Sequence, residues 1–300
     1  MKPNRIFILQ NPVAGTSNPD QVKEDLTRIL NQRDIPFEPY QTTPEDDIPT
    51  LTKQAISDGF DWIWAAGGDG TVSGVANGLI NTQAVMGIIP IGTGNSLARE
   101  LNIPLRAADA CRTLLDASQE RRIDALQVKE DYYLLAVSVG VGSKTMEETE
   151  RSQKRALGRL AYMVNGLRLI LTRQIWPFQV VVDGKSYRIP ATEIIATNVG
   201  IIGYKILRWD KDIQPDDGKV DLCYVKVNSA QTLLRALRGA VLDQQDQVVE
   251  LSCLSAEQEI LIDSNSQLPV QGDGDPIGTT PVHIKVIPKA ISMLVPTKGG

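Results

Sequence analysis

The chain of 300 residues has 42% hydrophobic side chains, enough for one large domain or two modest ones with real cores, which excludes disorder as the main state. Its 31 basic and 36 acidic residues give a formal charge of -5, so the composition disfavours a nucleic-acid-binding protein. The apolar run at residues 6–9 is too short for a signal peptide, and no stretch reaches the roughly 18 apolar residues needed to span a bilayer.

The three cysteines and the single histidine limit the kinds of metal site and catalytic group that the chain can contain. Cys111, Cys223 and Cys253 are far apart without a paired spacing, which favours buried thiols in a reducing, cytoplasmic compartment over disulfides or zinc ligation. His283 is the only histidine, so Ser–His catalysis and multi-histidine metal sites are nearly excluded. Proton transfer would therefore fall to carboxylates.

The first 120 residues alternate short apolar runs with longer mixed segments. This pattern is typical of strands and crossover helices that build a parallel sheet. Strands are expected over residues 5–9, 37–40, 62–66 and 85–90, and helices over 20–32, 47–57, 71–79 and 96–101 and after Pro104.

Beyond residue 122 the pattern changes to closely spaced strands with turn signals, which predicts an antiparallel sandwich. The strongest hairpin signal is Asp183-Gly184, because both residue types tolerate the positive φ of a type I′ turn. Strands are expected over 125–128, 132–139, 178–182, 185–189, 193–197, 220–227, 259–263 and 283–287, and helices over 154–172 and 229–241.

Three glycine-bearing loops, residues 11–15, 67–71 and 92–95, each follow a predicted parallel strand. Loops at the carboxyl ends of parallel strands converge, and glycine lets backbone N–H groups approach an anion closely. Each loop alone fits an ordinary strand-to-helix turn, but together they predict a phosphate-binding cradle. Neither a standard P-loop nor a Rossmann fingerprint is present.

Asp69 lies within the middle loop, just before a predicted helix. Its carboxylate has two interpretations at this point. It could cap the amino end of the helix, or it could hold Mg²⁺ through water, because that ion is typically shared between one or two carboxylates and the phosphates of a substrate.

These motifs carry a family resemblance. Residues 67–71, G-G-D-G-T, look like the signature shared by NAD kinases, phosphofructokinases and the diacylglycerol/sphingosine lipid kinases. The N-P-x-x-G of 11–15 and the G-T-G-N of 92–95 narrow the match to the lipid kinases. Residues 271–276, Q-x-D-G-D-P, are similar to the Q-x-D-G-E-P block of soluble bacterial diacylglycerol kinases, and the whole resemblance spans residues 6–296.

The resemblance implies a fold. Members of this family have a three-layer α/β nucleotide-binding domain of the NAD kinase and phosphofructokinase type, followed by an antiparallel β-sandwich, and their last strand returns to the first domain. The expected class is therefore α/β plus all-β. An ATP-binding domain would cover residues 1–123 with the returning segment 289–300, and a lipid-substrate domain would cover 124–288.

The resemblance also implies an activity, the ATP- and Mg²⁺-dependent transfer of a γ-phosphate to a primary hydroxyl of a lipid, with diacylglycerol as the default acceptor. By matching, Asp273 is the catalytic base and Asp69 the Mg²⁺ carboxylate, although composition alone favours a hairpin turn at Asp273-Gly274. The residues expected around the nucleotide phosphates are Asn11, Gly67, Gly68, Gly70, Thr71, Thr93, Gly94 and Asn95.

A second cation site is implied by a D-G turn at which relatives hold a structural Mg²⁺. Mapped onto this chain, its ligands are the Asp217 carboxylate and the carbonyls of Gln214 and Lys219. An acidic turn that merely caps a strand explains the same residues nearly as well.

Four departures from the family pattern bear on substrate identity and turnover. Ser96 replaces an aspartate that often follows G-T-G-N, and Gly74 replaces a common acidic residue after G-G-D-G-T. Asp275 replaces the glutamate of the Q-x-D-G-E block, and a Pro-x-Ala element is missing around residues 211–213.

Residues 151–173 combine apolar side chains at helical spacing with basic flanks. Such a segment can lie on an anionic membrane, although it more often covers a sheet. We therefore expect a cytoplasmic protein that meets its lipid substrate at the inner face of the membrane and has no nucleic-acid partner. A homodimer stays an open alternative, as do an NAD kinase-like enzyme and a catalytically silent nucleotide- and lipid-binding regulator.

Overall fold

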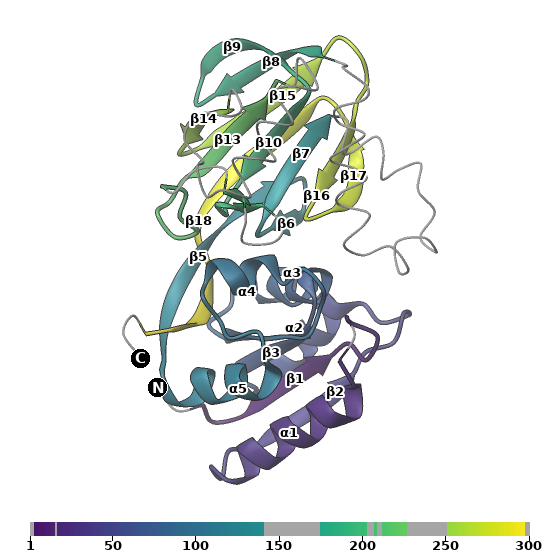
Figure 1. Cartoon of the computed structure of the whole chain (residues 1–300), viewed down its shortest axis with the longest axis vertical. Helices are drawn as coiled ribbons and strands as arrows, with labels where there is room; N and C mark the ends of the chain where they lie inside the picture. Colours follow the sequence, from purple (N-terminus) through teal and green to yellow (C-terminus); the bar gives the residue numbers. More distant parts are fainter. Residues whose placement is uncertain are drawn as a thin grey trace. The chain divides into compact units, whose positions relative to one another are not determined.

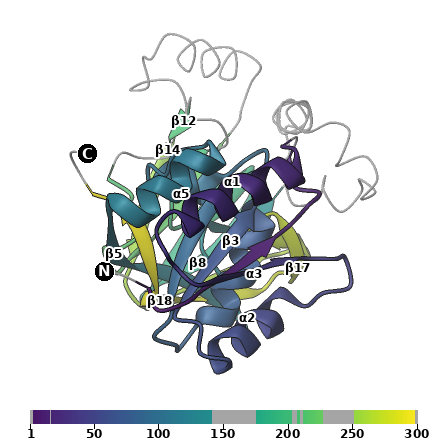
Figure 2. The same cartoon turned by 90° about the horizontal axis from the view of Figure 1, so that it is seen from below.

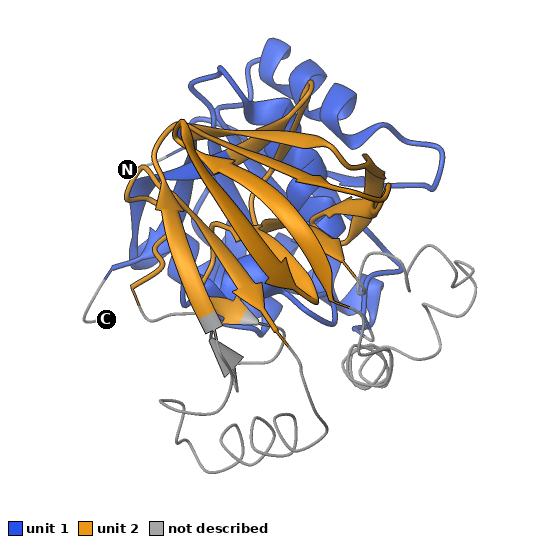
Figure 3. Cartoon of the chain, turned by 90° about the horizontal axis from the view of Figure 1, so that it is seen from above, with its two compact units in different colours: residues 1–125, 288–300 blue, residues 126–287 orange. Residues whose placement is uncertain are grey.

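The computed structural model describes residues 3–15, 17–140, 175–202, 207–208, 212–226 and 251–297. The chain forms two compact units: unit 1 comprises residues 1–125 and 288–300, and unit 2 comprises residues 126–287 (Figures 1 and 3). No helix within the described ranges is both long and apolar enough to cross a membrane. The helices expected over 154–172 and 229–241 and the basic segment 151–173 lie outside the described residues.

Unit 1 is built on a parallel sheet. Its three central strands are buried along their whole length, as expected for a sheet covered on both faces. The strands, in spatial order, are β2 (Phe37–Gln41), β1 (Ile6–Gln10), β3 (Trp62–Gly67), β4 (Val85–Pro90) and the last part of β18 (Val282–Pro296).

Helices cover both faces of this sheet, with α1 and α5 on one side and α2 and α3 on the other (Figure 2). Side chains cap the first two helices: Asn18 accepts N–H bonds at the start of α1, and Asp47 does so at the start of α2. The helices are α1 (Pro19–Asn31), α2 (Ile48–Ser57), α3 (Asp69–Leu79), α4 (Ser96–Glu100) and α5 (Ala107–Asp116). The expected three-layer α/β architecture is confirmed.

Unit 2 contains two antiparallel sheets, as the turn-rich second half predicted. Their inward-facing apolar side chains form one core, in which Phe178, Ile260 and Ile284 are fully buried. One sheet contains β9 (Lys185–Ala191), β8 (Trp176–Val182), β15 (Glu259–Ser264) and the start of β18, with β5 (Ser118–Val128) and β6 (Asp131–Tyr133) at its side. The other contains β14 (Leu251–Ala256), β13 (Val220–Val225), β10 (Glu193–Thr197), β7 (Ala136–Gly140), β16 (Pro269–Gly272) and β17 (Asp275–Thr279); β11 (Ile201–Ile202) and β12 (Leu207–Arg208) pair separately.

Several strand boundaries differ from the expected ones. The predicted strand 132–139 is two strands, β6 and β7, because the backbone between them turns to bind an aspartate carboxylate. The predicted strand 283–287 and the strand expected in the returning segment 289–300 belong to one long strand, β18. Strands β14, β16 and β17 were not predicted. The runs of β16 and β17 contain proline and glycine, and the two serines of β14 fall at positions that break any alternation of apolar and polar residues.

The expectation of buried thiols is wrong for two of the three cysteines. Cys223 in β13 and Cys253 in β14 are direct partners in the antiparallel register, with Cα atoms 4.1 Å apart, and they form a disulfide. Sequence spacing conceals this pairing, because strand register brings the two residues together across 30 positions. Cys111 in α5 is a buried free thiol, as expected.

Thiol counting tests this assignment. Burial raises the pKa of the Cys111 thiol to about 12, so this side chain stays protonated and unreactive near neutral pH. We expect a chromogenic disulfide reagent to detect no thiol in the native protein, one after denaturation without reductant, and three after denaturation with reduction and desalting. Three thiols without reductant would contradict the disulfide, and a Cys111→Ser variant should lose only the thiol exposed by denaturation.

Candidate phosphate-binding loops and the Asp273 turn

The three glycine-bearing loops lie together in unit 1, at the carboxyl ends of the adjacent strands β1, β3 and β4. Backbone hydrogen bonds join them where the strands end. The N–H of Asn11 donates to the carbonyl of Ala66 (2.9 Å), and the N–H of Ile91 donates to the carbonyl of Gly67 (3.1 Å). The parallel register therefore aligns all three loops at one edge of the sheet.

The loops pack backbone against backbone, and this requires glycine. A Cβ on Gly15, whose φ is +62°, would lie 2.2 Å from the carbonyl oxygen of Ile91. A Cβ on Gly92 would lie 2.4 Å from the Cα of Gly68. Gly70 differs, because an added Cβ there would meet nothing within 4 Å. The space beside Gly70 is thus open in this structure.

Amide side chains shape the first and third loops. Asn11 accepts an N–H bond from Val13 (3.1 Å), and its Nδ2 lies 3.5 Å from the Thr71 hydroxyl, which is buried. Asn95 has a φ of +53°, and its amide both accepts from the N–H of Gly92 (3.0 Å) and donates to the carbonyl of Gly92 (2.8 Å). Both asparagines therefore hold loop conformation, whatever else they bind.

Asp69 links the second loop to the third. Its Oδ1 accepts a 2.7 Å hydrogen bond from the backbone N–H of Ser96, the first residue of α4. A Cβ on Gly94 would lie 2.6 Å from Asp69 Oδ2, so only glycine permits this approach. Of the two interpretations of Asp69, capping of its own helix is wrong: the N-cap residue of α3 is Gly68, and no side chain of the described residues caps this helix. The carboxylate binds the start of α4 instead.

The bond between Asp69 and the backbone of Ser96 bears on the departure from the family pattern at position 96. The backbone N–H of Ser96 binds Asp69, so replacing the side chain at position 96 leaves that bond intact. A residue that the sequence did not single out also joins the loop: Arg99 Nε donates to the carbonyl of Gly94 (2.8 Å). No sequence signal marks Arg99, since the bond depends on how α4 folds back on its loop.

The Gly74 departure has a steric reason. A Cβ on Gly74 would lie 2.9 Å from the Cβ of Ile48, so α3 approaches α2 closely at this point. Gly78, one turn later, packs in the same way against Thr52. An acidic side chain at position 74 does not fit between the helices of this chain.

The pKa of Asp69 gives a pH prediction. Burial raises the pKa of this carboxyl, opposed by the N–H groups of Ser96, Asn95 and Leu97. The folded state therefore holds the proton more tightly than the unfolded state, and ionisation of Asp69 lowers stability as the pH rises through the interval above 3.8. As the pH rises from 3 to 7, the free energy of unfolding of Asp69→Asn should increase relative to that of wild type. Denaturant titrations at several pH values measure this trend.

Asp183 provides the control of opposite sign. Burial tends to raise its pKa, but N–H bonds from Glu257, Glu259 and Gln258 lower it overall. Its stabilising effect is present above the unfolded-state pKa and lost as the pH falls through the folded-state pKa. Asp183→Asn should therefore lose free energy of unfolding, relative to wild type, over the same rise in pH. Parallel trends in the two variants would contradict the assignment.

Asp273 lies in the turn between β16 and β17 of unit 2, with a φ of +48°. Its carboxylate accepts three backbone N–H bonds, from Leu134 (3.0 Å), Leu135 (2.9 Å) and Ala136 (3.0 Å). Its own N–H donates to the carbonyl of Ala136 (2.9 Å). The carboxylate thus fixes the β6–β7 connection.

The predicted hairpin turn at Asp183-Gly184 is confirmed, and the Asp183 carboxylate makes hydrogen bonds equivalent to those of Asp273. Asp183, with a φ of +46°, accepts from the N–H groups of Glu257 (2.8 Å), Gln258 (2.9 Å) and Glu259 (2.9 Å). Its own N–H donates to the carbonyl of Glu259 (3.1 Å). Among the described residues of unit 2, two Asp-Gly turns therefore place a carboxylate on the N–H groups of a neighbouring segment.

The proposed structural cation site is a tight turn before β13. Asp217 accepts an N–H bond from Lys219 (3.0 Å), and the Lys219 ammonium lies 3.3 Å from a carboxylate oxygen of Glu257. Burial raises the pKa of Asp217, and Gln214 is exposed. Within the described ranges, no group of three or more His, Cys, Asp or Glu side chains could hold a metal ion.

The structure thus groups the expected site residues into three sets. Unit 1 brings together Asp69 and all the residues expected around the phosphates, with Thr93 exposed on the third loop. Gln214, Asp217 and Lys219 share one turn of unit 2, and Asp273 lies in another. The N–H groups of residues 134–136, which bind Asp273, were not anticipated.

Comparisons with known proteins identify the class. Residues 5–128 match the family model described as the diacylglycerol kinase catalytic domain, and residues 135–295 match the YegS C-terminal NAD kinase beta sandwich-like domain. The chain belongs to this family of diacylglycerol kinase-like lipid kinases.

The similarity to individual relatives covers nearly the whole chain. A diacylglycerol kinase of Bacillus subtilis is 27% identical over 97% of this chain and 96% of its own length. An uncharacterized protein of Synechocystis is 28% identical over 97% of this chain and 70% of its own length. A crystal structure of a diacylglycerol kinase from Bacillus anthracis has the same fold, with a TM-score of 0.80 and 20% identity over 99% of both chains.

Proposed function

We propose that this protein is an ATP- and Mg²⁺-dependent kinase that transfers a γ-phosphate to the primary hydroxyl of a lipid, with diacylglycerol as the default acceptor. The observation that carries the proposal is the convergence of three glycine loops at the uncapped start of α3, beside the open space at Gly70. Backbone N–H groups at a helix amino end favour phosphate.

The residues of unit 1 fit a metal shared with a nucleotide. Mg²⁺ takes one or two carboxylates and completes its shell with water and phosphate oxygens, and Asp69 supplies a carboxylate at the loops. When bound, Mg²⁺ would neutralise charge on the phosphates. In this proposal Asn11, Thr71 and Asn95 shape the cradle, while Gly68, Gly70 and Thr93 border the nucleotide. Asp217, Gln214 and Lys219 would hold a second, structural Mg²⁺.

The proposed transfer forms a bond between the lipid hydroxyl oxygen and the γ-phosphorus, and breaks the bond to the oxygen that bridges the β- and γ-phosphates. Asp273 takes the proton from the hydroxyl, and ADP leaves. Its three N–H donors hold the carboxylate in one orientation. The protein would act from the cytoplasm at the inner face of the membrane.

One observation favours a second function, nucleotide and lipid binding without phosphoryl transfer. Like Asp273, Asp183 accepts three backbone N–H bonds, and it does so in a turn to which no chemistry is assigned. The Asp273 turn could therefore be structural alone.

An acceptor screen with radiolabelled ATP and Mg²⁺ tests both functions. Diacylglycerol, monoacylglycerol, a sphingoid base and a polyprenol are presented in mixed micelles, and NAD is presented in solution. We expect label in at least one lipid. Label in NAD alone would support an NAD kinase-like enzyme, and ATP binding without label in any acceptor would support the regulatory function.

A further inference from the structure

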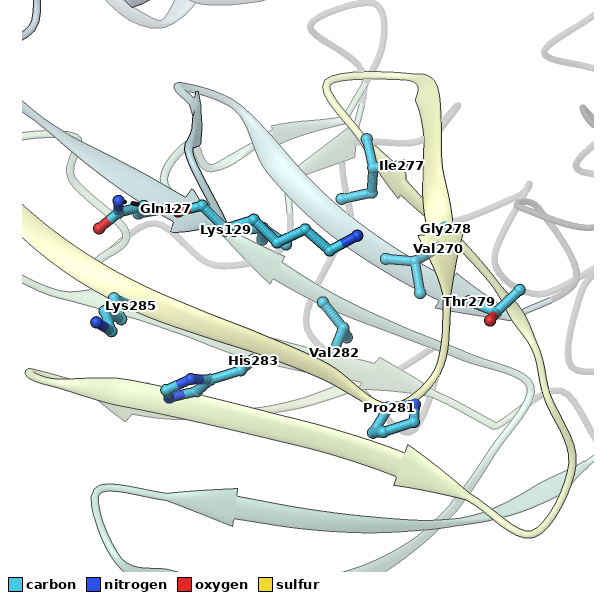
Figure 4. Close-up of a pocket in the computed structure, with 11 residues that line it drawn as sticks. Gln127, Lys129, Val270, Ile277, Gly278, Thr279, Pro281, Val282, His283 and Lys285 are labelled. Carbon is cyan, nitrogen blue, oxygen red and sulfur yellow. Dashed lines mark hydrogen bonds between the residues drawn. The ribbon is translucent and has the colours of Figure 1, made fainter.

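A pocket of about 340 Å³ opens in unit 2, where the end of β5 and the turn after it approach β17 and the start of β18 (Figure 4). Its inner wall is apolar. Val128, Val270 and Val282 belong to the buried core of unit 2, and Ile277 packs against that core. These valines are buried, so Ile277 and Pro281 supply the accessible apolar surface of the pocket. A ligand that enters it would contact the edge of the core.

Two lysines give the outer wall positive charge. Lys129 and Lys285 line the pocket together with His283, and its lining contains no Asp or Glu from the described parts of the chain. Glu259 lies beside the rim, where it contacts His283 and is the register partner of Lys285. Figure 4 shows the Lys129 side chain extending across the pocket toward Val270. In a chain with a net charge of -5, Lys129 and Lys285 provide a local attraction for an anionic group.

Hydrogen bonds fix the Lys129 backbone and the His283 ring. Lys129 has a φ of +54°, a conformation that lysine seldom adopts, and the Gln127 amide donates to the Lys129 carbonyl (3.0 Å). The His283 ring nitrogen Nε2 lies 2.8 Å from a carboxylate oxygen of Glu259, which fixes the ring at the pocket rim. The backbone and the rim of the pocket are therefore formed before any ligand binds.

We propose that this pocket binds an amphiphile with an anionic headgroup and one alkyl chain. The headgroup lies between Lys129 and Lys285, and the first carbons of the chain lie on Ile277 and Pro281, the lining apolar side chains that are not buried. Cations alone would accept any anion, and an apolar wall alone would accept a neutral molecule; the combination fits a ligand with both parts. The volume is near the lower end of ligand pockets, roughly 300–1,000 Å³, and is too small for a two-chain lipid.

The proposal does not depend on the proposed kinase activity, because no residue of this pocket belongs to the phosphate loops or to the Asp273 carboxylate network. A phosphate monoester and a carboxylate share the required headgroup chemistry. Decyl phosphate and decanoate represent the two sources of such a headgroup. Inorganic phosphate and decanol each lack one of the two required parts.

The unique histidine provides a direct readout. His283 lines the pocket and is the only histidine of the chain, so the untagged full-length protein gives one ring Cε1–H signal in a nuclear magnetic resonance spectrum. We expect submicellar decyl phosphate to shift this signal saturably, and calorimetry to show binding at least tenfold tighter than that of inorganic phosphate or decanol. Decanoate should bind within about tenfold of decyl phosphate.

Substitutions test which pocket residues contribute to decyl phosphate binding. Lys129→Gln combined with Lys285→Gln should weaken decyl phosphate binding at least tenfold, and Ile277→Ala should weaken decyl phosphate but not inorganic phosphate. Lys185→Gln is the matched control, because Lys185 is an exposed lysine of unit 2 outside the pocket. If circular dichroism shows that the double variant is unfolded, Lys129→Gln alone takes its place, since Lys129 is exposed.

Three results would overturn the proposal. The first is an unshifted His283 signal at saturating decyl phosphate. The second is equal affinity for inorganic phosphate, which would reduce the pocket to a site for free anions. The third is an equal loss of binding in Lys185→Gln, which would show general attraction by surface charge.

Discussion

Replacing Asp273 with asparagine should lower phosphoryl transfer to lipid by about 10²- to 10⁴-fold while ATP binding is retained, since this range is typical of a lost general base. The Asp273 carboxylate accepts N–H bonds from Leu134, Leu135 and Ala136, which hold it in one orientation. Asparagine presents one acceptor and one donor to those three N–H groups and cannot take the proton. Initial rates in mixed micelles and ATP affinity by calorimetry measure the two effects separately.

Asp183→Asn is a control within the same unit, because Asp183 makes equivalent bonds in an equivalent turn. Each variant weakens a charge-assisted set of hydrogen bonds, and each should lose about 1–3 kcal/mol of the free energy of unfolding. Only Asp273→Asn should lose turnover. Equal activities in the two folded variants would remove Asp273 from the chemistry and would support a binding function without transfer.

Gly92→Ala should destabilise unit 1 and strongly weaken ATP binding. The new methyl group would lie 2.4 Å from the Cα of Gly68, so the second and third loops must separate. Overpacking of this kind typically costs about 1–3 kcal/mol. Denaturant unfolding measures the loss of stability, and calorimetry with ATP and Mg²⁺ measures the loss of affinity.

Gly70→Ala separates binding from stability. An added Cβ at Gly70 meets no protein atom within 4 Å, and the position is in the first turn of α3. Alanine there should leave stability unchanged or raise it by about 0.5–1 kcal/mol, through its better helix propensity. We expect ATP affinity to fall at least tenfold, because the methyl group occupies space assigned to phosphate. Unchanged affinity would contradict the placement of phosphate at the start of α3.

The sequence predicted the parallel sheet well, for a physical reason. A strand buried on both faces needs a continuous apolar run, and a crossover helix needs apolar residues at helical spacing, so each element is visible locally. The predicted ends of β4 (Val85–Pro90) agree with the structure. The three loops followed from the strands, because parallel strands end at one edge.

Prediction was weaker where distant segments decide the outcome. The predicted strand 132–139 breaks at residues 134 and 135, because their N–H groups bind the Asp273 carboxylate instead of a neighbouring strand. The Cys223–Cys253 disulfide depends on the register of β13 with β14, which sequence spacing does not specify. In both cases the residue types were visible but their partners were not.

The candidate site, like the fold, was predicted only in part. Residue types and the family resemblance together predicted that glycine loops and two aspartates carry the chemistry, because glycine permits close backbone approach and carboxylates bind cations or protons. Only the tertiary structure decided what those aspartates contact: Asp69 binds the N–H of Ser96, 27 residues away, and Asp273 binds that of Leu134, 139 residues away. Such contacts arise from loop packing and strand register, which no local pattern encodes.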